Sequence, residues 1–580
     1  MTASEPPTSS RWPVVLFSLA AFFLLLGTRG LNEPDEGRYA EIAREMIERG
    51  DWLVPHLWYV PHLDKPPVTY WLVAASLKLF GLNAWAVRLP LALAGLSGVW
   101  AAFLLARSIA GAGAGRTAAL VLASSMLFWA MARMLTTDIF LTQFITWSLY
   151  FFWRSWRELD ALSDEDEDAR GRAGRKSFLW QVAAWAALAG GFLTKGPVAV
   201  AIPFAAVVAL LVFRRADKVR LNILLIGAVG GTLIFSLLAL PWYFAVFKAV
   251  PGSFDFMVKG QAIGHSLGGI DNRGKPFYFF IGVLAAGFLP WTPLLGWLWR
   301  RAHWRLLGKA HRDAWVLLTA WAAFTFVLFS LTRAKLPAYI VPMFPALAVL
   351  VAMRWREGFE EWGQEALASR LRTATACCAW LPLITLPLVF KFAFKLDDQP
   401  WMRTGMGLGC FMVVAVAFFA SRHWNVRGFP LQPAAMSAVA LLTVLFWTPE
   451  IETRLRSNQT LAPLGAALRA EVRPGDAILC MTRIPQGLPF HAFPAINATN
   501  RPFIHGFPMH RVPFAFPGNA DRMKPLLIPD EPSLSTFLGG DRRVLVVGFK
   551  GDVEKVRRLL PDSTPRLVLA SGEWELFSNR

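Results

Sequence analysis

The chain has 580 residues, of which 55% are hydrophobic and 17% charged, and its mean hydropathy is +0.41. Its apolar residues form long blocks separated by short charged patches, a composition that indicates an integral membrane protein and excludes a soluble globular one. The net charge of +19 does not imply a nucleic-acid partner, because much of it lies in short loops between apolar blocks. The positive-inside rule and anionic lipid surfaces account for such loops.

The first apolar block, residues 12–27, is followed by no small-x-small cleavage signal, so we expect a retained membrane helix that directs insertion. About thirteen blocks are long enough to cross the roughly 30 Å of bilayer hydrocarbon. They lie near residues 12–27, 84–106, 116–134, 137–153, 177–194, 197–213, 221–247, 276–299, 314–331, 336–353, 375–395, 404–421 and 433–447. The block at 66–80 is shorter and is expected in the membrane interface.

Arginine-rich loops indicate the orientation of these segments. With a cytoplasmic N-terminus, the loops at 154–176, 214–220, 300–312 and 354–372 all become cytoplasmic, as the positive-inside rule requires. The loops at 28–65 and 248–275, and everything after residue 448, then face outward. We expect the acidic run at 163–170 to be a solvated cytoplasmic loop.

After residue 448 the composition becomes that of a soluble domain. The segments DAILCMTR, RRVLVVGF and RLVLASG predict short buried strands, and GDVEKVRRLL predicts a helix between two of them. The sequence therefore divides into a transmembrane domain at 1–447, with outer-face juxtamembrane helices at about 33–80, and a small α/β domain at 448–580. The four cysteines form neither a disulfide framework nor a zinc-ligand pattern.

The stretch LNEPDEGRYAEIAREM, residues 31–46, follows the first apolar block. It predicts an amphipathic helix at the outer membrane boundary that starts at Asp35 and ends at Gly50, with Asp35 able to cap its N-terminus. Helical spacing assigns Tyr39, Ile42, Ala43, Met46 and Ile47 to one face and the charges to the others. Asp35 is thus either only a cap above a solvated charged face, or a functional carboxylate.

Two other outer corners also present carboxylates. Asp64 and Lys65 precede a double proline in HLDKPP, and Asp138 heads an otherwise apolar helix, where its default role is again an N-cap. Further cations occur at Lys195, Arg333 and Lys335. Carboxylates and cations at a membrane surface suit a lipid-linked phosphate substrate whose tail lies between apolar helices.

The motifs that carry these residues resemble a known family, the bacterial lipid A aminoarabinose transferases and their relatives among the protein mannosyltransferases. The matching segments are NEPDEGRYAEIAREM, LDKPPVTYWL, MLTTDIFLTQF, FLTKGP, LTRAKLPAYIVPMFPALAVL and, in the outer domain, GLPFHAF. The resemblance implies a polytopic α-helical membrane protein of the GT-C type that takes a sugar from an undecaprenyl-phosphate donor. It does not identify the sugar.

The resemblance also implies roles for individual residues. Asp35 and Asp138 would be the catalytic acids, while Arg38, Lys65 and Tyr339 would contact the donor phosphate. Contacts to the sugar or acceptor would come from Asp64, Glu36, Arg333 and Lys335. Asp64 stands where the family carries a glutamate that faces the sugar's amino group, so its side chain is one methylene shorter.

A larger departure lies in the loop VKGQAIGHSLGGIDNRGKPFYF. His265 lacks the preceding glutamate and the following arginine of the family, so Arg273 or Lys275 would have to replace the phosphate contact. We therefore assign no metal site and no cofactor. The sequence leaves a divalent cation open, but it does not supply a full ligand set for one.

The expected function is transfer of 4-amino-4-deoxy-L-arabinose to lipid A on the periplasmic face of a bacterial inner membrane. One alternative is a related enzyme that moves another polyprenyl-linked sugar, such as mannose, to a protein or cell-surface glycan. The other classes are a transporter or flippase and an outer-face scaffold. A transporter would place its ionisable or broken segments near the bilayer midplane, whereas these carboxylates lie at the outer helix ends.

Overall fold

The computed structural model describes most of the chain, and the statements below concern that part. The described residues are 12–160, 167–214, 218–258, 275–298, 309–355, 460–481, 485–493, 504–507, 521–522, 526–549, 551–559, 565–571 and 573–580. The predicted spans at 375–395, 404–421 and 433–447 lie outside these ranges, as does the predicted domain boundary at residue 447. His265 and Arg273 also lie outside them.

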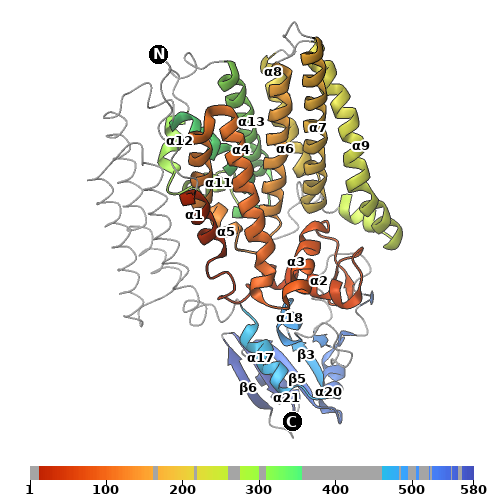
Figure 1. The fold of residues 1–580 in the computed structure, drawn as a ribbon. Coiled ribbons are helices and arrows are strands. Elements are labelled where there is room, and N and C mark those ends of the chain that lie inside the picture. Colours follow the sequence, from red (N-terminus) through yellow and green to blue (C-terminus); the bar gives the residue numbers. More distant parts are fainter. Residues whose placement is uncertain are drawn as a thin grey trace, which may run out of the picture.

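A bundle of long helices stands at one end of the molecule and a small sheet at the other (Figure 1). Two helices from the N-terminal part, α2 (Asp35–Arg49) and α3 (Val68–Phe80), lie between the bundle and the sheet, beside the short α18 (Leu488–Ala492). Segments from the N-terminal and C-terminal parts of the chain therefore lie together between the helix bundle and the sheet.

Apolar helices form the bundle. Within the described residues, five are long and apolar enough to cross a membrane, and they begin at residues 84, 168, 220, 311 and 337. The bundle contains α1 (Trp12–Phe23), α4 (Ala84–Ser124), α5 (Met126–Met131), α6 (Asp138–Glu158), α7 (Glu167–Lys195), α8 (Val198–Arg214), α9 (Lys218–Ala249), α11 (Phe279–Gly287), α12 (Thr292–Leu298), α13 (Lys309–Leu331) and the 3-10 helix η4 (Pro337–Met343), which continues as a helix to Trp355.

The 41-residue α4 is folded back on itself. Ala110 and Gly111 leave the helical region, and Gly111 has a φ of 84°, which a residue without a Cβ adopts at little cost. A Cβ on Gly115 would lie 2.9 Å from the carbonyl oxygen of Phe103, whereas in a straight helix these residues would be about 18 Å apart. The predicted block at 84–106 lies in the first arm of this helical hairpin. The block at 116–134 was predicted to be one span, and this is wrong, because the second arm ends at Ser124, Ser125 is extended, and the separate helix α5 follows.

The apolar block at 276–299 was predicted to be one span, and this prediction is wrong. The structure divides it into α11 and α12, with residues 288–291 between them outside any α-helix. Pro290 explains the break, because proline lacks a backbone N–H and disfavours the helical conformation of the residue before it.

A five-stranded mixed sheet forms the core of the C-terminal part. The strand order is β4-β3-β5-β7-β6; β4, β3 and β5 are parallel, and β7 pairs antiparallel with β5 and β6. The bounds are β3 (Ala477–Met481), β4 (Ile504–Phe507), β5 (Val544–Phe549), β6 (Arg566–Ser571) and β7 (Trp574–Ser578), with helices α17 (Ala462–Glu471), α20 (Glu531–Gly539) and α21 (Asp552–Leu559). The three predicted strands are β3, β5 and β6, and the predicted helix is α21. The strands β3 and β5 are buried as predicted, whereas β6 lies at the edge of the sheet with exposed and half-buried side chains, so its predicted burial is wrong.

Candidate functional site

The helix α2 begins at Asp35 and ends at Gly50, whose φ of 66° gives a left-handed C-cap, as the sequence predicts. The predicted capping role of Asp35 is wrong. Pro34 occupies the N-cap position, no side chain caps this end, and the Asp35 carboxylate pairs instead with the Arg38 guanidinium. Asp35 is the more exposed partner, with 42% of its side chain accessible, so its carboxylate can reach a substrate.

The loop that precedes α3 supplies a second carboxylate and a second cation. The Lys65 Nζ donates to the Asp64 carbonyl oxygen at 2.9 Å, and the Nε2 of the buried His62 lies 3.6 Å from the Asp64 Oδ2. Burial lowers the pKa of the Lys65 ammonium, and the Asp64 carboxylate opposes this shift. The cations Lys195 and Arg38 lower it further, which means that three cations lie within electrostatic reach of one another.

Asp138 and Lys195 form the third part of the site. Asp138 is the first residue of α6 and makes no capping hydrogen bond; its Oδ1 lies 2.5 Å from the Nζ of Lys195, the last residue of α7. The same ammonium lies 4.4 Å from the ring centroid of Tyr339 in η4. Three segments far apart in sequence therefore converge on Lys195, and Asp138 is a buried ion-pair partner and not the predicted N-cap.

Tyr39 links the carboxylates. Burial raises the pKa of its phenol above the ordinary value, and the Arg38 guanidinium opposes this shift. The carboxylates of Asp35, Asp64 and Asp138 raise it further. The carboxylates from three separate corners of the sequence therefore lie within electrostatic reach of one phenol.

The structure thus brings together six of the residues singled out from the sequence, namely Asp35, Arg38, Asp64, Lys65, Asp138 and Tyr339. We call these residues, with Lys195 and Tyr39, the outer cluster. The sequence identified Lys195 as an outer cation but gave it no place in the site, and helical spacing gave Tyr39 only a core role. His62 and Tyr70 were not singled out, although the Tyr70 ring lies 5.5 Å from that of Tyr39.

Glu36 was predicted to contact a sugar or acceptor, and its geometry argues against this. Its fully buried carboxylate accepts hydrogen bonds from Arg29 at 2.7 Å and Arg88 at 2.9 Å, and from the backbone N–H groups of Asn32 and Leu135, both at 3.0 Å. Burial would raise the pKa of Glu36, but Arg88 and Arg29 hold it well below its usual value. We therefore assign Glu36 a structural role.

Three more charged residues of α2 are buried, namely Glu41, Arg44 and Glu45, whereas Glu48 is half-buried and Arg49 is exposed. Most of these charges therefore do not form the solvated face that was the simplest interpretation of the sequence. Arg44 makes a two-fold hydrogen bond with Glu41, at 2.8 and 2.7 Å. Glu45 accepts the N–H groups of Trp58 at 2.6 Å and Tyr59 at 3.1 Å. These two residues form the turn between β1 (His56–Leu57) and β2 (Val60–Pro61) with positive φ angles of 55° and 67°, so Glu45 stabilises the hairpin that leads to Asp64 and Lys65.

Other predicted site residues lie apart from these contacts. The Lys335 ammonium is buried and donates to the Thr332 carbonyl oxygen, while Arg333 and Lys275 are exposed. In the described ranges, no group of three or more His, Cys, Asp or Glu side chains could hold a metal ion. The outer cluster instead offers cations for a phosphate and carboxylates for hydroxyl or amino groups.

The chain is similar to known sequences that are described as sugar transferases. Residues 64–242 match the family described as dolichyl-phosphate-mannose-protein mannosyltransferase. An undecaprenyl phosphate-alpha-4-amino-4-deoxy-L-arabinose arabinosyl transferase of Edwardsiella ictaluri is 33% identical over 342 residues, which cover 58% of each chain. The chain therefore spans less than two thirds of that relative's length. The transferase of the same description from an Enterobacter species is 27% identical over 474 residues, covering 78% of this chain and 74% of the relative.

A solved structure shares the fold. The crystal structure of ArnT from Cupriavidus metallidurans bound to undecaprenyl phosphate superposes with a TM-score of 0.79 at 24% identity, and the match covers 99% of each chain. The chain thus shares the fold of that structure, and its long apolar helices agree with the polytopic α-helical membrane protein predicted from the sequence.

Proposed function

We propose that this chain, which is related to the bacterial aminoarabinose transferases and to the protein mannosyltransferases, is an inverting membrane glycosyltransferase. Its donor is a sugar linked to undecaprenyl phosphate. The first of two candidate reactions is transfer of 4-amino-4-deoxy-L-arabinose to a lipid A phosphate. The reaction takes place in the outer cluster, on the periplasmic side of a bacterial inner membrane.

The proposal rests on the ion pair between Asp138 and Lys195, whose Oδ1 and Nζ atoms lie 2.5 Å apart. The Lys195 ammonium also lies beside Tyr339 and within electrostatic reach of Lys65. A flippase has no need for an ion pair at one membrane surface with two further cations close by. A phosphate leaving group does need such cations, because charge builds on its oxygens as the bond to the sugar breaks.

In the proposed mechanism, the acceptor oxygen attacks the anomeric carbon from the face opposite to the phosphate. The bond from the anomeric carbon to the phosphate oxygen breaks, and its electron pair leaves with the polyprenyl phosphate. Lys65 and Arg38 stabilise the developing negative charge by hydrogen bonds and Coulomb attraction. Burial lowers the pKa of the Lys65 ammonium, and an anionic phosphate beside it acts in the opposite direction, because a nearby negative charge favours the charged form of lysine.

The acceptor determines what Asp35 does. A lipid A phosphate has a second pKa of about 6 and is largely ionised at neutral pH, so it needs little help from a base and Asp35 would orient it. A hydroxyl acceptor would have to lose a proton, and Asp35 is then the general base because its carboxylate is the most exposed of those described in the outer cluster.

An Asp35→Asn variant tests the assignment. We expect it to remain in the membrane and to lose at least about 100-fold in transfer rate, the range typical of removing an acid–base or orienting group. Glu48→Gln on the same helix is the matched control, because Glu48 contacts Arg44 away from the outer cluster. Full activity of Asp35→Asn, measured as sugar transferred per folded protein, would remove Asp35 from the mechanism.

Asp64 leaves open a second candidate reaction, in which the lipid-linked donor carries a different sugar. Asp64 has a shorter side chain than the family's glutamate and lies 3.6 Å from His62, so it is less able to reach an amino group on the sugar. Transfer of another polyprenyl-linked sugar is therefore the second candidate. Mass spectrometry of lipid A from cells with and without the protein separates the two, since only the first candidate adds the mass of an aminopentose.

A further inference from the structure

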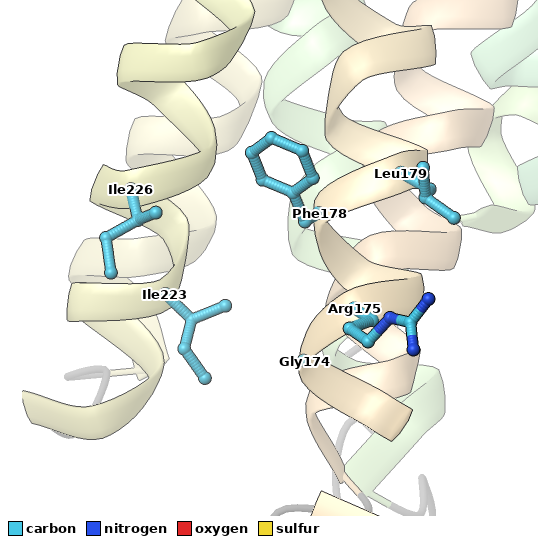
Figure 2. A pocket seen from close by; sticks show the side chains of 6 residues that line it. All are labelled: Gly174, Arg175, Phe178, Leu179, Ile223 and Ile226. Carbon is cyan, nitrogen blue, oxygen red and sulfur yellow. The ribbon is translucent and has the colours of Figure 1, made fainter. Parts of the chain in front are cut away.

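A cavity of about 350 Å³ lies between α7 and α9, away from the outer cluster. Its lining consists of Gly174, Arg175, Phe178, Leu179, Ile223 and Ile226. Figure 2 shows the Phe178 ring between the two helices, the isoleucines on α9, and Arg175 nearer the N-terminal end of α7. The cavity thus has apolar walls and a single cationic side chain at one end.

The packing of the two helices explains why a cavity forms here. Deeper in the bundle they are in close contact, because a Cβ on Gly227 would lie 2.2 Å from Gln181 and one on Gly231 would lie 1.9 Å from Trp185. Phe178 approaches Gly230 in the same way, at 2.9 Å. The cavity begins where this series of close contacts ends.

The position of Arg175 along α7 places the cavity at the second membrane boundary. Lys195 in the outer cluster lies twenty residues further along the same helix, a distance of about 30 Å at 1.5 Å per residue. This equals the thickness of the hydrocarbon core. Arg175 therefore lies at headgroup level when Lys195 lies at the opposite headgroup level, and residues 178–192 between them are apolar except for Gln181.

One exposed cation lines the cavity at this boundary. Residues 164–176 contain five acids and four cations, so this segment as a whole is not positively charged, and the side chains of Arg170, Arg172, Arg175 and Lys176 are exposed. Of these cations, only Arg175 lines the cavity. Its guanidinium can bind a phosphate in a bidentate manner while an acyl chain occupies the space lined by Phe178, Ile223 and Ile226.

We propose that this cavity is a binding site for an anionic glycerophospholipid of the leaflet opposite the outer cluster. Arg175 binds the headgroup phosphate, and the apolar walls hold the upper part of one acyl chain. The site is separate from the donor lipid and takes no part in the chemistry.

Native mass spectrometry of the full chain tests the site. The protein is equilibrated with equal amounts of phosphatidylglycerol and phosphatidylcholine, and the lipids retained after detergent removal are counted. We expect preferential retention of one phosphatidylglycerol by the wild type, and a loss of at least about 5-fold in that preference for Arg175→Gln, since a charged contact is worth on the order of 1 kcal/mol. Lys176→Gln is the matched control, because it removes an adjacent exposed charge that does not line the cavity.

A second pair of variants probes the apolar walls. Nothing lies within 4 Å of a Cβ on Gly174 or on Gly171, so leucine fits at both positions and improves helix propensity. Gly174→Leu fills the cavity and should abolish retention of the phospholipid, while Gly171→Leu, outside the cavity, should not. Equal losses for Arg175→Gln and Lys176→Gln, or unchanged retention by Gly174→Leu, would overturn the proposal.

Discussion

Adjacent carboxylates on α2 have opposite environments. Asp35 is partly exposed and pairs with Arg38, whereas Glu36 is fully buried between two arginines and two backbone N–H groups. Neighbouring helix positions differ by about 100° in direction, so one residue faces the outer cluster and the next faces the core. The motif therefore combines a proposed functional group, Asp35, with a structural one, Glu36.

Removal of the Glu36 charge should destabilise the protein. Glu36→Gln leaves Arg29 and Arg88 without their shared carboxylate, and breaking such a buried pair typically costs about 3–5 kcal/mol. We expect a lower melting temperature in detergent, with activity per folded molecule largely retained at low temperature. A variant with unchanged melting temperature and lost transfer would instead return Glu36 to the catalytic site.

Glu45 should make stability fall as the pH rises. Burial and the neighbouring Glu41 raise its pKa to about 8 in the folded protein, above the value of 4.5 that it has when exposed. The folded state thus holds a proton that the unfolded state releases, and the resulting stability is complete below about pH 4.5 and is lost as the pH rises through 8. Thermal unfolding at pH 6 and pH 9 measures this difference.

The neutral isostere provides the control for this prediction. Glu45→Gln cannot titrate and still accepts an N–H from the turn at Trp58 and Tyr59, so we expect its melting temperature to change less between the two pH values. Glu48→Gln should behave like the wild type. Parallel pH profiles for the wild type and Glu45→Gln would contradict the assignment.

At the scale of elements, α18 of the C-terminal part positions α2. The backbone N–H of Gly487 donates to the Glu33 carboxylate at 3.3 Å, and a Cβ on Gly487 would lie 2.7 Å from the Cα of Gly37. The Trp58 Nε1 donates to the Gln486 carbonyl oxygen at 3.3 Å. The start of α2, which carries Asp35 and Arg38, is therefore held by direct backbone contact with the GLPFHAF segment.

Substitution of Gly487 should separate these backbones and shift the outer cluster. We expect Gly487→Ala to reduce kcat about 10-fold or more, because small displacements of catalytic groups are costly, with a smaller change in KM and normal membrane insertion. Gly540→Ala is the control, since its Cβ would make only ordinary contacts of 3.6 Å or more. Equal kinetics for the two variants would mean that α18 does not position α2.

The limits of α2 could be predicted from the sequence, while its burial could not. Gly50 and the helical spacing are local signals, and they gave the observed bounds Asp35–Arg49. The burial of Glu36 depends on Arg88, which is 52 residues away, and the Glu45 contacts depend on a turn 13 and 14 residues further along the chain. Charge partners that are distant in sequence have no periodic signal.

The sequence predicted only part of the outer cluster, because some of its charge partners are also distant in sequence. The family motifs identified Asp35, Lys65 and Asp138, but the pairing of Asp138 with Lys195 depends on how α6 packs against α7. The helix break at Pro290 is a different case. The proline is a visible signal in the sequence, but the prediction of one span followed the apolar composition of the surrounding residues instead.

At the scale of the whole molecule, the proposed orientation places the C-terminal part on the periplasmic side of the membrane and the N-terminal end of α7 on the cytoplasmic side. Asp541 is fully exposed in the C-terminal part, and Gly171 is exposed at the N-terminal end of α7. In spheroplasts, a membrane-impermeant maleimide should label Asp541→Cys and should label Gly171→Cys only after permeabilisation. Cys480 is buried, and the unsubstituted chain gives the background. Labelling of Gly171→Cys alone in intact spheroplasts would reverse the proposed orientation.

The helix α7 connects the two ends of the bundle as a rigid rod with a cation at each boundary, Arg175 and Lys195. A bilayer that becomes thinner or thicker than this spacing makes the rod tilt or draws its ends into the hydrocarbon. Because Lys195 is bound to Asp138 at 2.5 Å, any such tilt is transmitted to the reacting groups. If the proposed function holds, we expect the rate of sugar transfer to depend on the acyl-chain length of the host membrane.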